Sequence, residues 1–126
     1  MKTDSCRVLV VDADRENANS SVTLLQLWGH EAEAAYSAED AIAKALALDP
    51  DVVLVDLVMP TTNGTGIASE LRQVCPAAKF LATTGFARAD IVRRSREAGI
   101  ATVLMKPVPA KVLQEAVETE CAAVSK

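Results

Sequence analysis

The sequence predicts a single α/β domain built on a doubly wound parallel sheet, with helices on both faces. Apolar runs at residues 8–11 and 52–55 show no alternation, which is typical of central parallel strands that are covered on both sides. Strand-like and helix-like segments also alternate along the chain, and strands joined by crossover helices must be parallel. The 126 residues suit one domain, whose core we expect at about residues 7–120.

Five strands and five helices are expected. The strands are predicted at residues 7–12, 31–35, 52–56, 79–83 and 101–105, and an amphipathic helix follows each one. Capping or breaking residues mark the helix ends, with Asp14 and Ser37 at N-termini, and Gly29, Pro50, Pro76 and Gly99 at C-termini. Right-handed crossovers leave few topologies, so we expect the flavodoxin-like strand order 2-1-3-4-5.

Charge and composition exclude several function classes. The net charge is −4 and no basic run is present, so neither nucleic acid nor an anionic membrane is an expected partner. No apolar run approaches membrane-spanning length, and residues 1–5 lack the apolar core of a secretion signal. We therefore expect a cytoplasmic location.

The cysteines and the one histidine are expected to be incidental. Cys6, Cys75 and Cys121 are odd in number and widely spaced, which favours reduced thiols over a disulfide framework or a zinc site. His30 follows Gly29 in an expected turn, where a solvated side chain is more common than a ligand.

Polar residues gather where the strands end. Asp12 and Asp56 end the first and third strands, which are neighbours at the switch point of the expected order, so the two acids should share a pocket. Thr84 and Lys106 stand at the ends of the fourth and fifth strands. Such a site suits a divalent cation held by oxygen ligands beside a phosphoryl group, with Asp56 as the nucleophile. In a plainer interpretation, Lys106 only forms an ion pair with Asp56, and Thr84 is a turn residue.

These residues resemble the receiver domain of two-component response regulators. The shared motifs are Val-Val-Asp12, Asp56-Leu-Val-Met-Pro60 with Gly64, Ala-Thr-Thr84-Gly85 and Lys106-Pro107. The resemblance implies that Asp56 accepts the phosphoryl group and that Asp12, Asp56 and the backbone carbonyl of Val58 bind Mg²⁺. It implies that Thr84 is the switch hydroxyl, that Lys106 pairs with the phosphorylated site, and that the peptide bond before Pro107 is cis.

The sequence departs from this family at four positions. Ala13 stands where the family usually has a second acid that binds the metal, so Mg²⁺ affinity should be reduced; Asp14 is an alternative ligand, although capping the helix is its expected role. Val103 replaces an aromatic residue that often moves with the switch threonine. Val58 and Phe86 are apolar where polar residues often orient the attacking water, so we expect slow loss of the phosphoryl group.

The expected function is that of a phosphorelay receiver, which takes a phosphoryl group from a histidine kinase or phosphotransfer protein and changes its surface for an unknown downstream protein or attached domain. It would not be an enzyme acting on a separate substrate. One alternative is a degenerate receiver that binds partners without phosphate, as Ala13 suggests. Another is a phosphatase in which Asp12 is the nucleophile, since Asp12-Ala-Asp14 resembles the start of haloacid-dehalogenase-type enzymes. The segment Gly64-Thr-Gly66 is too incomplete to predict a nucleotide cofactor.

Overall fold

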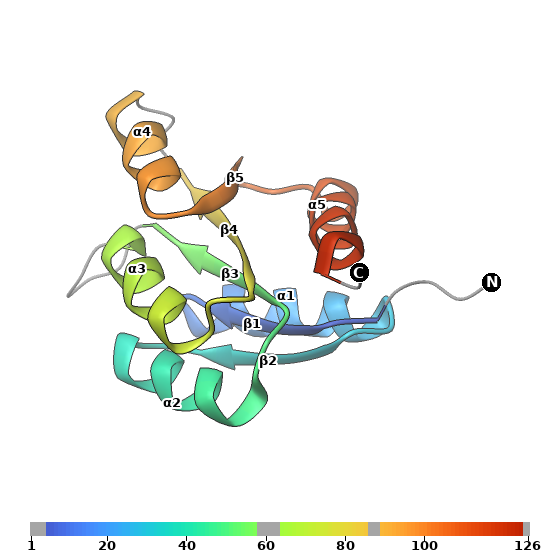
Figure 1. The fold of residues 1–126 in the computed structure, drawn as a ribbon. Coiled ribbons are helices and arrows are strands. Elements are labelled where there is room, and N and C mark those ends of the chain that lie inside the picture. Colours follow the sequence, from blue (N-terminus) through green and yellow to red (C-terminus); the bar gives the residue numbers. More distant parts are fainter. Residues whose placement is uncertain (1–4, 58–63, 86–88, 125–126) are drawn as a thin grey trace.

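The protein folds as a strict alternation of strands and helices (Figure 1). The computed structural model describes residues 5–57, 64–85 and 89–124. The strands are β1 (Arg7–Val11), β2 (Glu31–Ala35), β3 (Val52–Asp56), β4 (Lys79–Thr84) and β5 (Ile100–Met105). The helices are α1 (Arg15–Leu27), α2 (Ala38–Leu48), α3 (Gly64–Val74), α4 (Ala89–Glu97) and α5 (Ala110–Val124). The strands pair in parallel in the order β2-β1-β3-β4-β5, which confirms the predicted topology.

Alternate residues of the central strands build two separate cores. Val8, Val10 and Leu54 face the cluster that contains the buried side chains of α1 and α5. Leu9 and Val11 belong to the other cluster, which contains the buried side chains of α2 and α3. Both clusters exclude water from the sheet, so the unbroken apolar runs of β1 and β3 are explained by burial on both faces.

The caps of the first two helices are those that the sequence indicates. The carboxylate of Asp14 accepts a hydrogen bond from the backbone N–H of Asn17 at 3.2 Å, and the hydroxyl of Ser37 accepts one from the N–H of Asp40 at 3.1 Å. Gly29 follows α1 with a φ of +95°, a conformation that favours glycine.

The strand register brings the polar strand ends to one edge of the sheet. Val11 lies beside Val55, and Asp56 lies beside Thr83. Because side chains alternate along a strand, Asp56 and Thr83 share the face of Leu54, which α1 and α5 cover, whereas Thr84 belongs to the opposite face. The carboxylate of Asp56 is therefore on the α1/α5 side of the sheet.

The expectations for two cysteines and the histidine are wrong. Cys6 and Cys121 form a disulfide that joins the residue before β1 to α5, and only Cys75 is a free thiol among the described residues. His30 is 5% exposed, because its imidazole packs beside Cys6 instead of facing solvent. Separation in sequence misled the cysteine prediction: parallel strand order places the start of β1 beside the end of α5 although 115 residues separate them.

Within the described ranges, no helix combines the length and the apolar character that a membrane span requires.

Two leucines of α1 provide a matched test of the packing. Leu25 is fully buried and Leu27 is 75% exposed. We expect Leu25→Ala to lower the free energy of unfolding by about 2–5 kcal/mol, because it leaves a cavity in the core, and Leu27→Ala to change it by less than about 0.5 kcal/mol. Urea unfolding followed by Trp28 fluorescence measures both. Equal losses in the two variants would contradict the described packing of α1.

Candidate functional site

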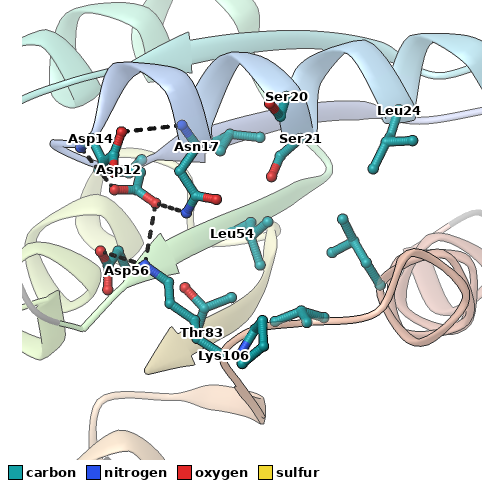
Figure 2. A pocket seen from close by; sticks show the side chains of 15 residues that line it. Asp12, Asp14, Asn17, Ser20, Ser21, Leu24, Leu54, Asp56, Thr83 and Lys106 are labelled. Atoms are coloured by element: carbon teal, nitrogen blue, oxygen red, sulfur yellow. Dashed lines mark hydrogen bonds and ion pairs between the residues drawn. The ribbon is translucent and has the colours of Figure 1, made fainter. Parts of the chain in front are cut away.

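A cavity of about 540 Å³ opens at the carboxyl edge of the sheet, between α1 and α5 (Figure 2). Its polar end contains Asp12, Asp56, Thr83 and Lys106, which stand within one residue of the ends of β1, β3, β4 and β5. The rest of the lining comes from the sheet, from α1 and α5, and from the segments that precede these helices, namely Val10, Val11, Asp14, Asn17, Ser20, Ser21, Leu24, Leu54, Pro107, Val108 and Leu113. The position at the strand ends is where open α/β sheets bind ligands.

One ammonium group lies between two buried carboxylates. Lys106 Nζ lies 3.0 Å from Asp56 Oδ2 and 3.6 Å from Asp12 Oδ2, as the dashed lines in Figure 2 show. Asp12 is 4% exposed and Asp56 is 7% exposed. Two carboxylates and one ammonium group have a net charge of −1, so the pocket attracts a further cation.

Asp12 is held by two more hydrogen bonds. Its Oδ1 accepts the backbone N–H of Asp14 at 2.9 Å, and its Oδ2 accepts the side-chain amide of Asn17 at 2.7 Å (Figure 2). Sequence reasoning missed Asn17. The signal for it was its place in the first turn of α1, three residues after the cap Asp14, where a side chain can reach back toward the end of β1.

The environment of Lys106 favours its charged form. Partial burial lowers the pKa of Lys106, but the hydrogen bond to Asp56 and the charges of Asp56 and Asp12 together outweigh it, so the pKa lies above its ordinary value of 10.5. The backbone N–H of Lys106 donates to the carbonyl of Thr84 at 2.8 Å, and the peptide bond before Pro107 is cis, as the resemblance implies.

The two threonines at the end of β4 face different sides of the sheet. Thr83 lines the cavity beside Asp56, and Figure 2 shows its hydroxyl near the acid cluster. Thr84 is fully buried and does not line this cavity. The structure therefore brings together Asp12, Asp56 and Lys106, but it leaves Thr84 outside the pocket, and the switch role of Thr84 stays a prediction.

The residues expected to bind the metal or to act beside it have different outcomes. Asp14 lines the cavity and caps α1, so the capping role is confirmed. Val58 and Phe86, whose roles the sequence predicts, lie outside the described residues. Asp12 and Asp56 offer hard carboxylate oxygens in a negatively charged pocket, which fits a magnesium ion that takes one or two carboxylates and completes its shell with water and phosphate.

Comparisons with known proteins agree with this geometry. Residues 8–118 match the model of the response regulator receiver domain family. The chain is 32% identical over 111 residues to the transcriptional regulatory protein ZraR of Salmonella typhimurium, covering 88% of this chain and 25% of ZraR. It is 32% identical over 102 residues to the response regulator receiver protein Anae109_2439 of Anaeromyxobacter sp., covering 81% of this chain and 43% of that protein.

A solved structure shows the same fold. The CheY-like receiver domain protein of Methanospirillum hungatei JF-1 superposes with a TM-score of 0.89 at 28% identity, covering 94% of this chain and 95% of that one. The chain belongs to the response regulator receiver domain family of two-component signal transduction systems. It spans 25% of the length of ZraR and 43% of that of Anae109_2439, which are both longer proteins.

The ion cluster predicts a pH dependence. A raised pKa in the folded state means that Lys106 stabilises the fold fully below its ordinary pKa of 10.5, and that this stabilisation is lost as the pH rises through the higher folded value. We expect Lys106→Met to lower the free energy of unfolding by about 1–3 kcal/mol at pH 7, because it removes hydrogen bonds to charged groups. The difference in free energy of unfolding between variant and wild type should decrease as the pH rises above 10.5.

Urea unfolding between pH 7 and pH 11.5 measures this gap. Lys79→Met is the matched control, because Lys79 is exposed at the start of β4, and its gap should stay near zero at every pH. A gap for Lys106→Met that stays constant to the highest pH would show that the ammonium charge does not stabilise the fold.

Proposed function

We propose that this receiver domain accepts a phosphoryl group on Asp56 from a phosphorylated histidine of a kinase or phosphotransfer protein. The observation that carries the proposal is the contact between Asp56 Oδ2 and Lys106 Nζ at 3.0 Å, in a pocket where Asp12 contacts the same ammonium group. Ion-pair networks occur without function, but this one lies at the mouth of a cavity at the carboxyl edge of a parallel sheet.

The transfer uses the chain's own groups. A carboxylate oxygen of Asp56 attacks phosphorus, the bond between phosphorus and the donor's imidazole nitrogen breaks, and that nitrogen keeps the electron pair. Lys106 holds the carboxylate before attack and remains close enough to stabilise the negative charge of the phosphoryl oxygens. Asn17 and the N–H of Asp14 fix the orientation of Asp12.

Receiver domains bind Mg²⁺, and in this chain Asp12, Asp56 and the backbone carbonyl of Val58 are the proposed ligands. The ion supplies positive charge to the transferred oxygens when it is bound. Ala13 offers no carboxylate, and the carboxylate of Asp14 already accepts the N–H of Asn17, so we propose weaker Mg²⁺ binding than a second acid would give.

The response to phosphorylation is proposed to pass through Thr84. This side chain is buried on the opposite face from Asp56, and its backbone carbonyl accepts the N–H of Lys106, the residue that follows β5. Movement of Thr84 toward a phosphoryl group would shift the β4–β5 edge, where Met105 is 46% exposed. Arg93, Arg94 and Arg96 are exposed on the neighbouring α4 and suit an acidic partner surface.

The domain is proposed to catalyse only its own phosphorylation and dephosphorylation, and to act in the cytoplasm, where a kinase can supply phosphohistidine. Its downstream partner is another protein or an attached domain. A degenerate receiver remains the second candidate, because Asn17 occupies one oxygen of Asp12 and Lys106 contacts both acids, so the network is satisfied without metal or phosphate.

A phosphotransfer assay tests the first proposal. Incubated with Mg²⁺ and acetyl phosphate, the wild type should gain one phosphoryl group and Asp56→Asn should gain none, as intact mass measures. Peptide mapping should place the group on Asp56. A group on Asp12 would instead support the phosphatase interpretation, and absence of any label at high Mg²⁺ would support the degenerate receiver.

The missing acid gives a second test. We expect Ala13→Asp to increase Mg²⁺ affinity by about tenfold or more, because it adds a carboxylate beside Asp12 and Asp56. Isothermal titration of Mg²⁺ measures affinity directly, and the concentration of Mg²⁺ that half-saturates the phosphorylation rate should fall in parallel. Ala43→Asp, at an exposed position of α2, is the control for added charge. No gain for Ala13→Asp beyond that control would contradict the role assigned to this position.

A further inference from the structure

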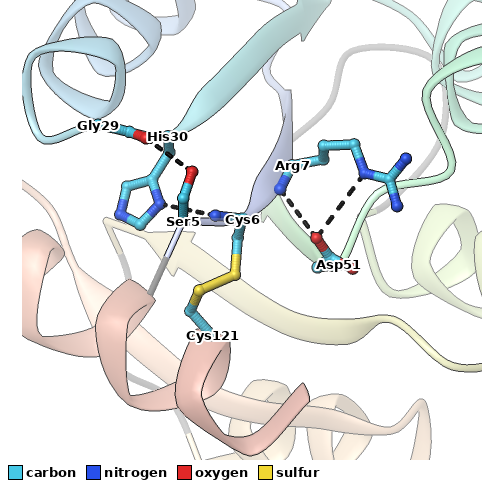
Figure 3. The surroundings of a disulfide bond; sticks show 7 residues. All are labelled: Ser5, Cys6, Arg7, Gly29, His30, Asp51 and Cys121. Atoms are coloured by element: carbon cyan, nitrogen blue, oxygen red, sulfur yellow. Dashed lines mark hydrogen bonds and ion pairs between the residues drawn. A yellow bond between two sulfur atoms is a disulfide. The ribbon is translucent and has the colours of Figure 1, made fainter. Parts of the chain in front are cut away.

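A buried disulfide closes the end of the domain opposite the phosphoacceptor (Figure 3). Cys6, just before β1, is bonded to Cys121 of α5, with a Cα–Cα distance of 5.9 Å. The two residues are 5% and 1% exposed. The imidazole of His30 lies beside them, and its Nδ1 accepts the backbone N–H of Cys6 at 3.1 Å.

We propose that Cys6 and Cys121 form a reversible thiol–disulfide site, and that its oxidation state controls how firmly α5 is held against the sheet. This inference rests on the proposed function in one respect, which is that the domain works in the cytoplasm. Disulfides there are usually transient and redox-sensing, whereas a secreted protein would keep the bond permanently.

The packing of α5 explains why the bond matters. Its buried side chains include Leu113, Val117 and Cys121, spaced four residues apart on one stripe. Val112 beside this stripe is 42% exposed. Partly buried Ala116 packs against the same core, and the covalent bond at Cys121 adds to this packing in the C-terminal half of α5.

The other end of α5 reaches the phosphoacceptor cavity. Leu113 lines that cavity, as do Pro107 and Val108 of the segment that joins Lys106 to α5. A change in the docking of α5 therefore alters the wall of the cavity that holds Asp56.

A buried imidazole lies beside the two sulfur atoms, and its Nδ1 is occupied by the N–H of Cys6. One ring nitrogen of His30 and the two sulfur atoms lie within 4.8 Å of one another. Burial lowers the pKa of His30, with the charge of Glu118 opposing, which favours the neutral imidazole. The second ring nitrogen, Nε2, is buried without a hydrogen-bond partner in the part of the chain that the structure describes.

The oxidant for the two thiols is a low-molecular-weight disulfide such as oxidised glutathione. The thiolate of one cysteine attacks a sulfur of that disulfide and releases one glutathione thiolate. The thiolate of the other cysteine then attacks the mixed disulfide and releases the second. Two protein thiols lose two electrons and two protons, and the reagent becomes two thiols. Because both cysteines are buried, exchange requires opening of the last turns of α5.

Titration of the wild-type protein with oxidised and reduced glutathione tests the proposal. We expect intact mass to change by two hydrogens between the forms, reversibly. Reduction should increase the equilibrium constant for unfolding by about 100-fold and speed amide exchange in the second half of α5 by about tenfold or more. Cys121→Ser should behave like the reduced protein under both conditions. Cys75→Ser should behave like wild type, because the serine hydroxyl can keep the hydrogen bond that the thiol of Cys75 donates to the carbonyl of Leu71.

Three results would overturn the proposal. One is a native protein that forms no internal disulfide in the glutathione buffer. Another is a reduced protein with the same stability and the same α5 exchange as the oxidised one. The third is stoichiometric Zn²⁺ uptake by the reduced wild type that Cys6→Ser abolishes, which would make the cluster a metal site. None of these measurements needs phosphorylation, so repeating them in Asp56→Asn separates this proposal from the one for Asp56.

Discussion

The ammonium group of Lys106 is the constraint on which the site depends. Asp12 and Asp56 are both buried, and two carboxylates on adjacent strand ends repel each other unless a cation lies between them. The parallel register brings the two acids together. Lys106 directly follows the last residue of β5, and from there its side chain reaches both carboxylates. The ion pairs therefore balance most of the negative charge of the two acids within the chain itself.

Successive side chains of β4 point to opposite faces of the sheet. Thr83 and Thr84 are neighbours, yet one lines the α1/α5 cavity and the other lies buried on the side of α2 and α3. In the proposed function, Asp56 and Thr84, the residue proposed to respond to it, therefore face opposite sides of the sheet. The carbonyl of Thr84 accepts the backbone N–H of Lys106, so a displacement of the end of β4 would also move the residue that follows β5.

Sequence reasoning recovered the features that follow from local pattern. Unbroken apolar runs and helix caps determine the elements, and strand ends in a parallel sheet must share an edge, so Asp12, Asp56 and Lys106 were found together. Features that depend on three-dimensional packing were missed. Asn17 contacts Asp12 only because α1 turns back over β1, and Cys6 meets Cys121 only because α5 ends beside the start of β1.

The bond between Cys6 and Cys121 also decides how the domain responds to mechanical load. It joins two points near the ends of the described chain, so it closes nearly the whole fold into a covalent ring. Tension applied through segments attached before Cys6 and after Cys121 would run through the two sulfur atoms and bypass the sheet. Reduction would redirect the same tension through β1 and α5, and pulling would then peel these elements away from the domain.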